Sequence, residues 1–279
     1  MNRSSFLKQI STLFVFALTF TMTTAGIVNA AGNELTIKGS TTVLPVAQIT
    51  AEVFMDRNPD IDISVQGGGS GVGIASLLDN TTDIADSSRE IIDKEIARAK
   101  EKGITPHEIV IAMDGIAVIV HPSNIISYLT KEQIKAIYTG KISNWAEIGG
   151  EDKKIVVVSR DTSSGTFEAF EKLAIDKEKV RPDALTTASN QAVVMTVASS
   201  PNAIGYAGLG YLSKKVKPLR VNKVECTRET IISGAYPLSR PLYMYTNGAP
   251  GGTTKQFIDF ILSEEGQKLV EEEGFVGLK

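Results

Sequence analysis

Residues 155–166 read IVVVSRDTSSGT, an apolar run that gives way to an arginine and a turn rich in small hydroxyl residues. The run from Ile155 to Val158 consists of β-branched residues, which are typical of a buried strand. Beyond the turn, apolar residues recur at the spacing of one helix face: Phe167, Phe170, Leu173 and Ala174. The stretch therefore predicts a strand, a donor-rich turn and a helix in immediate succession.

Two earlier junctions have the same design. A strand expected at Leu35–Lys38 ends in GSTT at residues 39–42, and one expected at Ile61–Val65 ends in GGGSG at residues 67–71. The first backbone N–H groups of a helix are unpaired and carry partial positive charge, while glycine lets a ligand approach the backbone. In open α/β sheets, ligands bind beyond the carboxyl ends of strands. The three loops therefore predict a binding site for an oxyanion.

Each loop also has a plain structural explanation, because Ser and Thr are common helix N-caps and glycine-rich turns are widespread. The recurrence of the design and the charge of Arg160 favour a binding site. Arg160 could instead join a surface ion pair. Its place between an apolar strand and a hydroxyl-rich turn favours a bidentate grip on a tetrahedral oxyanion.

The rest of the chain alternates strand and helix patterns, which predicts an α/β architecture with mostly parallel sheets. Apolar strand runs at residues 109–112 and 115–120 are separated by an expected break at Asp114. Two helices are expected to end the chain, at residues 253–262 and 263–273. No repeat, low-complexity tract or flexible linker marks a domain boundary.

Composition excludes some function classes. Of the 279 residues, 42% are hydrophobic and 22% are charged, which is typical of a globular protein. With a formal net charge of −3, the chain lacks the excess of basic residues that is typical of nucleic-acid-binding proteins. We therefore expect no nucleic-acid partner. Local geometry, rather than global charge, would have to attract an anion.

Residues 1–30 are predicted to form a signal peptide. Arg3 and Lys8 precede an apolar stretch at residues 13–20, and residues 28–30 (VNA) fit a small-x-small cleavage pattern near Ala30. A membrane anchor is the alternative, but threonines interrupt the apolar run. The single cysteine, Cys226, allows neither a lipid anchor near the cleavage site nor an intramolecular disulfide. We therefore expect a periplasmic or extracellular protein.

Catalytic patterns are missing from the sequence. Residues 67–73 do not fit G-x-G-x-x-G, and no Walker-type phosphate loop occurs. His107 and His121 do not have the spacing of metal ligands. Ser163 and Ser164 are not framed by G-x-S-x-G. The sequence thus predicts no catalytic residue, no metal site and no cofactor.

Taken in order, six motifs resemble the phosphate-binding proteins of the bacterial and archaeal phosphate ABC transporter, which belong to the class II periplasmic-binding-protein family. The resemblance covers essentially the whole chain after residue 30. Its motifs are GSTTVLP (39–45), QGGGSG (66–71), DIADSSR (83–89), YTGKISNW (138–145), RDTSSGT (160–166) and AIGY (203–206).

The resemblance implies an α/β fold of the two-lobed type 2 class, with a mixed sheet flanked by helices in each lobe and a hinge of two crossover strands. Lobe one would comprise residues 31–114 and 224–279, and lobe two residues 115–223, with a return crossing near Val221–Val224. Phosphate would lie in the cleft of a monomer that serves a membrane permease. Its implied contacts come from both lobes: Thr41, Thr42, Ser70, Arg160, Ser164, Gly165 and Thr166.

One position departs from the family pattern. Well-known members carry an aspartate after the third strand that accepts a proton from the ligand, whereas this chain has Ser88, followed by Arg89. Such an acceptor disfavours fully ionised sulfate. Asp114 is the first candidate to replace it, followed by Asp86 and Asp161, and each could equally be a turn residue or a partner of Arg160. Arg89 would add a second positive contact, and Ser88 would still line the site.

Three hypotheses remain open at this stage. The first is a binding protein that captures inorganic phosphate for an ABC importer, and the second is the same scaffold tuned to sulfate, molybdate or tungstate. The third is a secreted phosphate-ester hydrolase with Ser164 as its nucleophile. The lack of an evident base or metal cluster counts against the hydrolase.

Overall fold

The computed structural model describes residues 33–278, so the predicted signal peptide lies outside the described residues. One nine-stranded sheet runs through this part of the chain in the order β2-β1-β3-β11-β4-β8-β6-β7, with β9 beside β4. Between residues 33 and 278, no helix combines the length and apolarity needed to span a membrane.

Two main hydrophobic cores lie along this sheet, and we call the part of the protein around each one a lobe. The strand β4 (Pro106–Val120) runs through both lobes. The other elements of the first lobe are β1 (Glu34–Gly39), α1 (Leu44–Arg57), β2 (Asp62–Gln66), α2 (Ser70–Leu78), β3 (Ile84–Ser87), α3 (Asp93–Glu101), β11 (Ser239–Asn247), α8 (Gly252–Leu262) and α9 (Glu264–Glu272).

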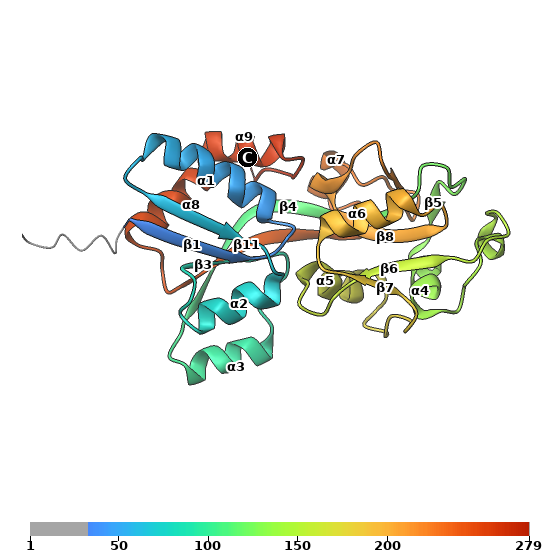
Figure 1. Ribbon diagram of the computed structural model, residues 1–279, viewed down its shortest axis with the longest axis horizontal. Coiled ribbons are helices and arrows are strands. Elements are labelled where there is room, and N and C mark those ends of the chain that lie inside the picture. Colours follow the sequence, from blue (N-terminus) through green and yellow to red (C-terminus); the bar gives the residue numbers. More distant parts are fainter. Residues whose placement is uncertain (1–32, 279) are drawn as a thin grey trace, which may run out of the picture. The chain divides into compact units, whose positions relative to one another are not determined.

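In the first lobe, β1, β2 and β3 are parallel, and β11 is antiparallel to both β3 and β4. Helices α1, α8 and α9 cover one face of this sheet, and α2 and α3 lie on the other (Figure 1). Phe54 of α1 packs edge-on against Phe257 of α8, with ring centroids 5.5 Å apart. The parallel order brings the carboxyl ends of β1, β2 and β3 to one edge.

The second lobe is built on β8, which pairs with β4 and with β6. Its elements are β5 (Tyr128–Leu129), α4 (Lys131–Thr139), η2 (Trp145–Ile148), β6 (Val156–Arg160), α5 (Gly165–Ala174), β7 (Leu185–Thr187), α6 (Asn190–Ser199), β8 (Ala203–Gly208), η3 (Leu209–Tyr211), β9 (Lys217–Pro218), β10 (Arg220–Val221) and α7 (Arg228–Ile232). Phe170 stacks on Tyr206 at 3.9 Å in its core. This packing fixes α5 against β8, the neighbour of the strand β6 that precedes the hydroxyl-rich turn.

The predicted break at Asp114 is wrong, because β4 is one continuous strand. It pairs with β11 as far as Gly115 and with β8 from Ile116 onward. The buried acid does not interrupt the strand, because Arg240 lies opposite Asp114 in the β11 register and compensates its charge. The strand changes partners here, and its neighbour β11 leads back to the first lobe.

The return crossing predicted near Val221–Val224 is followed by a segment that still packs in the second core. Residues after 224 still bury their side chains in the second core: Cys226, Ile231, Tyr236 and Leu238. The first core is rejoined at Leu242 on β11. Tyr236 helps to hold the intervening segment, because its hydroxyl donates to the Ile116 carbonyl oxygen at 2.9 Å.

Candidate functional site

The glycine-rich turn of the first lobe touches the hydroxyl-rich turn of the second. Gly71 N donates to the Ser163 carbonyl oxygen at 3.0 Å, and Ser163 Oγ donates to the Gly68 carbonyl oxygen at 3.1 Å. Gly69 has a φ of 103°. A Cβ there would lie 2.5 Å from the Ser163 carbonyl oxygen. Glycine is therefore needed for the lobes to meet at this point.

The predicted threonines also meet across the lobes. Thr42 Oγ1 lies 2.7 Å from Thr166 Oγ1, and both side chains are buried. Thr41 is held by the second lobe as well, because the Tyr211 hydroxyl donates to its carbonyl oxygen and Asn190 Nδ2 donates to its Oγ1 at 3.2 Å. The structure thus brings Thr41, Thr42 and Thr166 together.

Ser70, Ser88 and Gly165 form a second contact. Ser70 Oγ accepts a hydrogen bond from Ser88 N at 3.0 Å and lies 3.4 Å from Ser88 Oγ. A Cβ on Gly165 would lie 2.2 Å from Ser70 Oγ, so any larger residue would push the lobes apart. Ser164 caps α5, because its Oγ accepts from Phe167 N at 3.2 Å. The first N–H groups of α5 have no acceptor within the helix and lie at this contact.

Arg160 has an unusual environment. Its side chain is 1% exposed, and its Nε and Nη2 donate to the carbonyl oxygens of Thr187 and Ala188 at 3.2 and 3.1 Å. Its Nη1 has no hydrogen-bond partner among the described residues. The nearest carboxylate oxygen in an ion pair, from Asp161, is 3.9 Å away. Burial lowers the pKa of Arg160, although Asp161 opposes the shift, so this charge lacks close compensation.

Asp114 is bound to an arginine that the sequence did not single out. Its Oδ2 accepts from Nε and Nη2 of Arg240 at 3.0 and 2.9 Å, and its Oδ1 accepts from Leu209 N at 2.9 Å. Burial raises the pKa of Asp114, and the charge of Arg240 opposes that shift. Asp114 is therefore the counter-ion of Arg240 on the two strands that join the lobes.

The two other candidate proton acceptors, Asp161 and Asp86, differ in their hydrogen bonding. Asp161 Oδ1 accepts from Ser163 N at 2.9 Å and from the Ser163 hydroxyl, so it orders the turn. Asp86 is 1% exposed, and its Oδ1 has no hydrogen-bond partner within residues 33–278. Burial raises the pKa of Asp86 well above its ordinary value, so a neutral carboxyl is favoured. The ranking of the three acids as proton acceptors stays a prediction.

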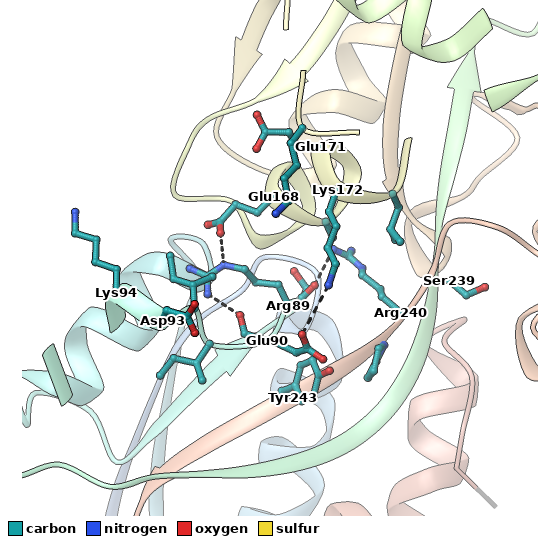
Figure 2. A pocket seen from close by; sticks show the side chains of 17 residues that line it. Arg89, Glu90, Asp93, Lys94, Glu168, Glu171, Lys172, Ser239, Arg240 and Tyr243 are labelled. Atoms are coloured by element: carbon teal, nitrogen blue, oxygen red, sulfur yellow. Dashed lines mark hydrogen bonds and ion pairs between the residues drawn. The ribbon is translucent and has the colours of Figure 1, made fainter. Parts of the chain in front are cut away.

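Arg89 does not point at the threonine cluster. Its Nη1 and Nη2 donate to the two carboxylate oxygens of Glu95 at 2.8 Å, and its Nε pairs with Glu168 Oε2 of the second lobe at 2.8 Å. This side chain lines a cavity of about 710 Å³ that also touches Ser88 and Arg240 (Figure 2). Arg89 is thus committed to a bridge between the lobes rather than to a second positive contact.

Two buried residues at the site were missed from the sequence. Arg240 lies in a strand whose SRPLYMY pattern does not reveal the acid opposite it. Asn190 follows an N-cap serine and looks like an ordinary residue of the first helical turn. The pairing of Arg240 with Asp114 depends on a strand register that only the folded chain defines.

A family model for the PBP superfamily domain matches residues 24–265. The phosphate-binding protein PstS of Bacillus subtilis is 36% identical over 248 residues, which cover 88% of this chain and 81% of that protein. PstS of Borreliella burgdorferi is 34% identical, with coverage of 95% and 99%. The chain belongs to the PstS family within the PBP superfamily.

Solved structures agree with this assignment. A phosphate ABC transporter substrate-binding protein from Clostridium perfringens, with phosphate bound, is 38% identical and superimposes with a TM-score of 0.83 over 88% of this chain and all of that one. An ABC-type phosphate transport receptor from Vibrio cholerae is 36% identical, with a TM-score of 0.73, and covers 87% of this chain and 99% of that one. The two-lobed type 2 fold is therefore confirmed, and these relatives are named as binding or transport proteins rather than enzymes.

Two observations bear on the hydrolase hypothesis. Within residues 33–278, no group of three or more His, Cys, Asp or Glu side chains is placed to hold a metal ion. Ser164, the nucleophile of the hydrolase hypothesis, uses its hydroxyl oxygen as the cap of α5. What the site offers instead is hydrogen-bond donors.

Proposed function

We propose that the protein captures inorganic phosphate outside the cytoplasm and delivers it to the permease of an ABC importer. The observation that carries this proposal is the buried guanidinium of Arg160, whose Nη1 lacks a partner beside the loops that the family resemblance connects with phosphate. An unpaired charged donor in a buried place is costly unless a ligand completes it. Two relatives named as phosphate-binding proteins and a phosphate-bound neighbour support the choice of anion.

The ligand would lie between the lobes and hold them together. We propose that its direct contacts come from the predicted set without Arg89 and Asp114, whose charged groups have protein partners, and without Thr42, whose hydroxyl lies 2.7 Å from Thr166 Oγ1: Thr41, Ser70, Ser88, Arg160, Ser164, Gly165 and Thr166. Arg89 and Asp114 would act around this set. No reaction is needed, because a ligand that contacts both lobes favours the closed state by its differential affinity.

The lobe division itself is also a proposal. The distribution of the two cores supports a first lobe of residues 33–114 and 239–278 and a second lobe of residues 115–238. This moves the second boundary from the predicted 223/224 to the start of β11. We further propose that residues 1–30 act as a cleaved signal peptide and that the periplasmic or extracellular protein works as a monomer.

Isothermal titration calorimetry with inorganic phosphate and with sulfate, across pH, tests this function. We expect saturable phosphate binding and negligible sulfate binding. Comparable affinities for the two anions would refute selection by a proton acceptor and would favour a general oxyanion carrier. Molybdate and tungstate titrations extend the same comparison.

The hydrolase hypothesis has its own test, the turnover of a chromogenic phosphate ester. We expect no turnover above the rate without protein. Hydrolysis that is abolished in Ser164→Ala would contradict a purely binding role.

A further inference from the structure

We infer that Asn190 and Arg240 are positioning residues that fix the hydrogen-bond polarity of three threonines, so that the Thr41 and Thr166 hydroxyls donate to the bound anion. The inference rests on the proposed function and adds how the site presents donors. It comes from counting donors and acceptors in the cross-lobe network around Thr42.

Asn190 is fully buried at the start of α6. Its Oδ1 accepts a hydrogen bond from Gly208 N at 3.1 Å. Because a backbone N–H can only donate, this contact settles which end of the amide is oxygen. Asn190 Nδ2 therefore donates, to Thr42 Oγ1 at 2.9 Å and to Thr41 Oγ1 at 3.2 Å, from the second lobe to the first.

Arg240 supplies the other fixed donors. Nε and one Nη2 hydrogen serve Asp114, while Nη1 serves the carbonyl oxygens of Ser88 and Gly165 at 3.0 and 3.4 Å. The remaining Nη2 hydrogen is shared between Thr166 Oγ1 at 2.9 Å and Thr42 Oγ1 at 3.3 Å. All five N–H groups are thus used within the protein, and none is left for a ligand.

The direction of the network follows from the capacity of a hydroxyl, which has two lone pairs and one hydrogen. Thr42 Oγ1 faces two fixed donors, Asn190 Nδ2 and the Arg240 Nη2 hydrogen that it shares with Thr166, so its lone pairs are engaged and its own hydrogen is free to be donated. The acceptor at 2.7 Å is Thr166 Oγ1. Thr166 then accepts from Arg240 and from Thr42, and its own hydrogen must point out of the network.

The result is a relay of one polarity, from Asn190 and Arg240 through Thr42 to Thr166. Thr41, whose oxygen accepts from Asn190, likewise keeps its hydrogen for another acceptor. A hydroxyl held as a donor stabilises an anion without having to reorient, whereas a lone pair in the same place would repel it. Asn190 and Thr166 belong to the second lobe, whereas Thr41, Thr42 and Arg240 belong to the first, so the polarity is set when the lobes are closed.

The variant Asn190→Asp tests the relay, because a carboxylate of the same shape would accept from the threonines and reverse their polarity. At pH 8 we expect the Kd for inorganic phosphate to rise by about 30-fold or more relative to wild type. The ratio of the two Kd values should fall toward one as the pH is lowered to 5, because a protonated carboxyl regains a donor. Wild type measured at each pH removes the effect of phosphate ionisation.

The matched control is Gln191→Glu, which adds the same charge at the exposed neighbouring position of α6 and should change the Kd by less than about twofold. Wild-type affinity of Asn190→Asp at pH 8, or a loss that is unchanged at pH 5, would overturn the relay. Because the new charge also repels a bound anion, the deuterium positions decide between the relay and simple repulsion.

Neutron diffraction from the deuterated wild-type protein tests the relay without a variant. The Thr42 deuterium should lie on the line to Thr166 Oγ1, and the Thr166 deuterium should point away from Thr42. The opposite direction would overturn the inference, even if Asn190→Asp failed to fold. A wild-type protein that gave no heat with phosphate at any pH would refute the proposed function instead, and the deuterium positions would still decide the relay.

Discussion

Arg160 of the second lobe and Arg240 of the strand that joins the lobes are both buried, yet their surroundings differ in one respect. Arg240 has a carboxylate partner in Asp114 and an acceptor for each of its N–H groups. Arg160 has two carbonyl oxygens, a carboxylate 3.9 Å away and an Nη1 without a partner. Burial alone therefore does not distinguish the two arginines, whereas the lack of a close carboxylate and of an acceptor for Nη1 does.

The largest effect should come from breaking the compensated pair. Asp114→Ala leaves the charge of Arg240 buried without a counter-ion, which should lower the free energy of unfolding by about 3–5 kcal/mol. Urea denaturation measures this change. The control is Asp161→Ala, which removes the carboxylate 3.9 Å from Arg160. It should lower the free energy of unfolding by about 1 kcal/mol or less. Equal losses in the two variants would contradict the distinction between the arginines.

Removing the uncompensated arginine should instead affect binding. Arg160→Ala should weaken phosphate binding by about 2–5 kcal/mol, as measured by calorimetry. Arg181→Ala is a matched control, because Arg181 of the second lobe also has an Nη1 without a partner but is paired with Asp183 at 2.6 Å. It should bind phosphate within about twofold of wild type. An unchanged affinity in Arg160→Ala would mean that the loop carrying it does not hold the ligand.

Asp86 is an acidic counterpart of Arg160, a buried carboxyl with an unpartnered oxygen. Because burial raises its pKa in the folded state, the folded protein binds more protons than the unfolded chain above the ordinary aspartate pKa. Stability should therefore fall as the pH rises from about 4 toward the folded-state pKa. Asp86→Asn should raise the Tm more at pH 7 than at pH 4.

Thermal unfolding of Asp62→Asn, an exposed aspartate on β2, provides the control for Asp86→Asn and should show no such trend. A Tm gain in Asp86→Asn that is the same at both pH values would contradict a raised pKa.

The smallest effect is expected at the bridge beside the cavity. Glu168→Gln removes the charge that joins the lobes through Arg89, while the bidentate pair with Glu95 remains. Since Glu168 is 26% exposed, we expect phosphate affinity to fall by no more than about fivefold. Calorimetry at low and high salt measures the phosphate affinity of Glu168→Gln. A loss of affinity as large as that of Arg160→Ala would contradict the smaller effect expected at Glu168.

Local patterns were sufficient for much of the fold. The strand, turn and helix around Arg160 could be predicted because each has a clear local signal, and the family resemblance supplied the two lobes and the type 2 topology. The continuity of β4 through Asp114 was not predictable, because an acid in a strand looks like a break until Arg240 is known to lie opposite it. The packing of Cys226 and Tyr236 in the second core was not predictable, because the segment that contains them has no strong local pattern.

The candidate site divides in the same way. The hydroxyls of Thr42 and Thr166 could be predicted to meet, because helix N-termini and family motifs mark both loops. The roles of Asn190 and Arg240 could not be predicted, because they depend on hydrogen bonds to Thr42. Asn190 is 148 positions away from Thr42 in the sequence, and Arg240 is 198 positions away. The ion pairs of Arg89 could not be predicted either, because a sequence does not show that Glu95 and Glu168 lie beside its guanidinium.

A crystal structure of the protein with inorganic phosphate tests the contrast between the two arginines most directly. We predict that Arg160 Nη1 lies about 2.7–2.9 Å from a phosphate oxygen, the range of a charge-assisted hydrogen bond, and that Arg240 keeps all its N–H groups on protein acceptors. A phosphate bound by Arg240, or one that leaves Arg160 Nη1 without a partner, would contradict the account.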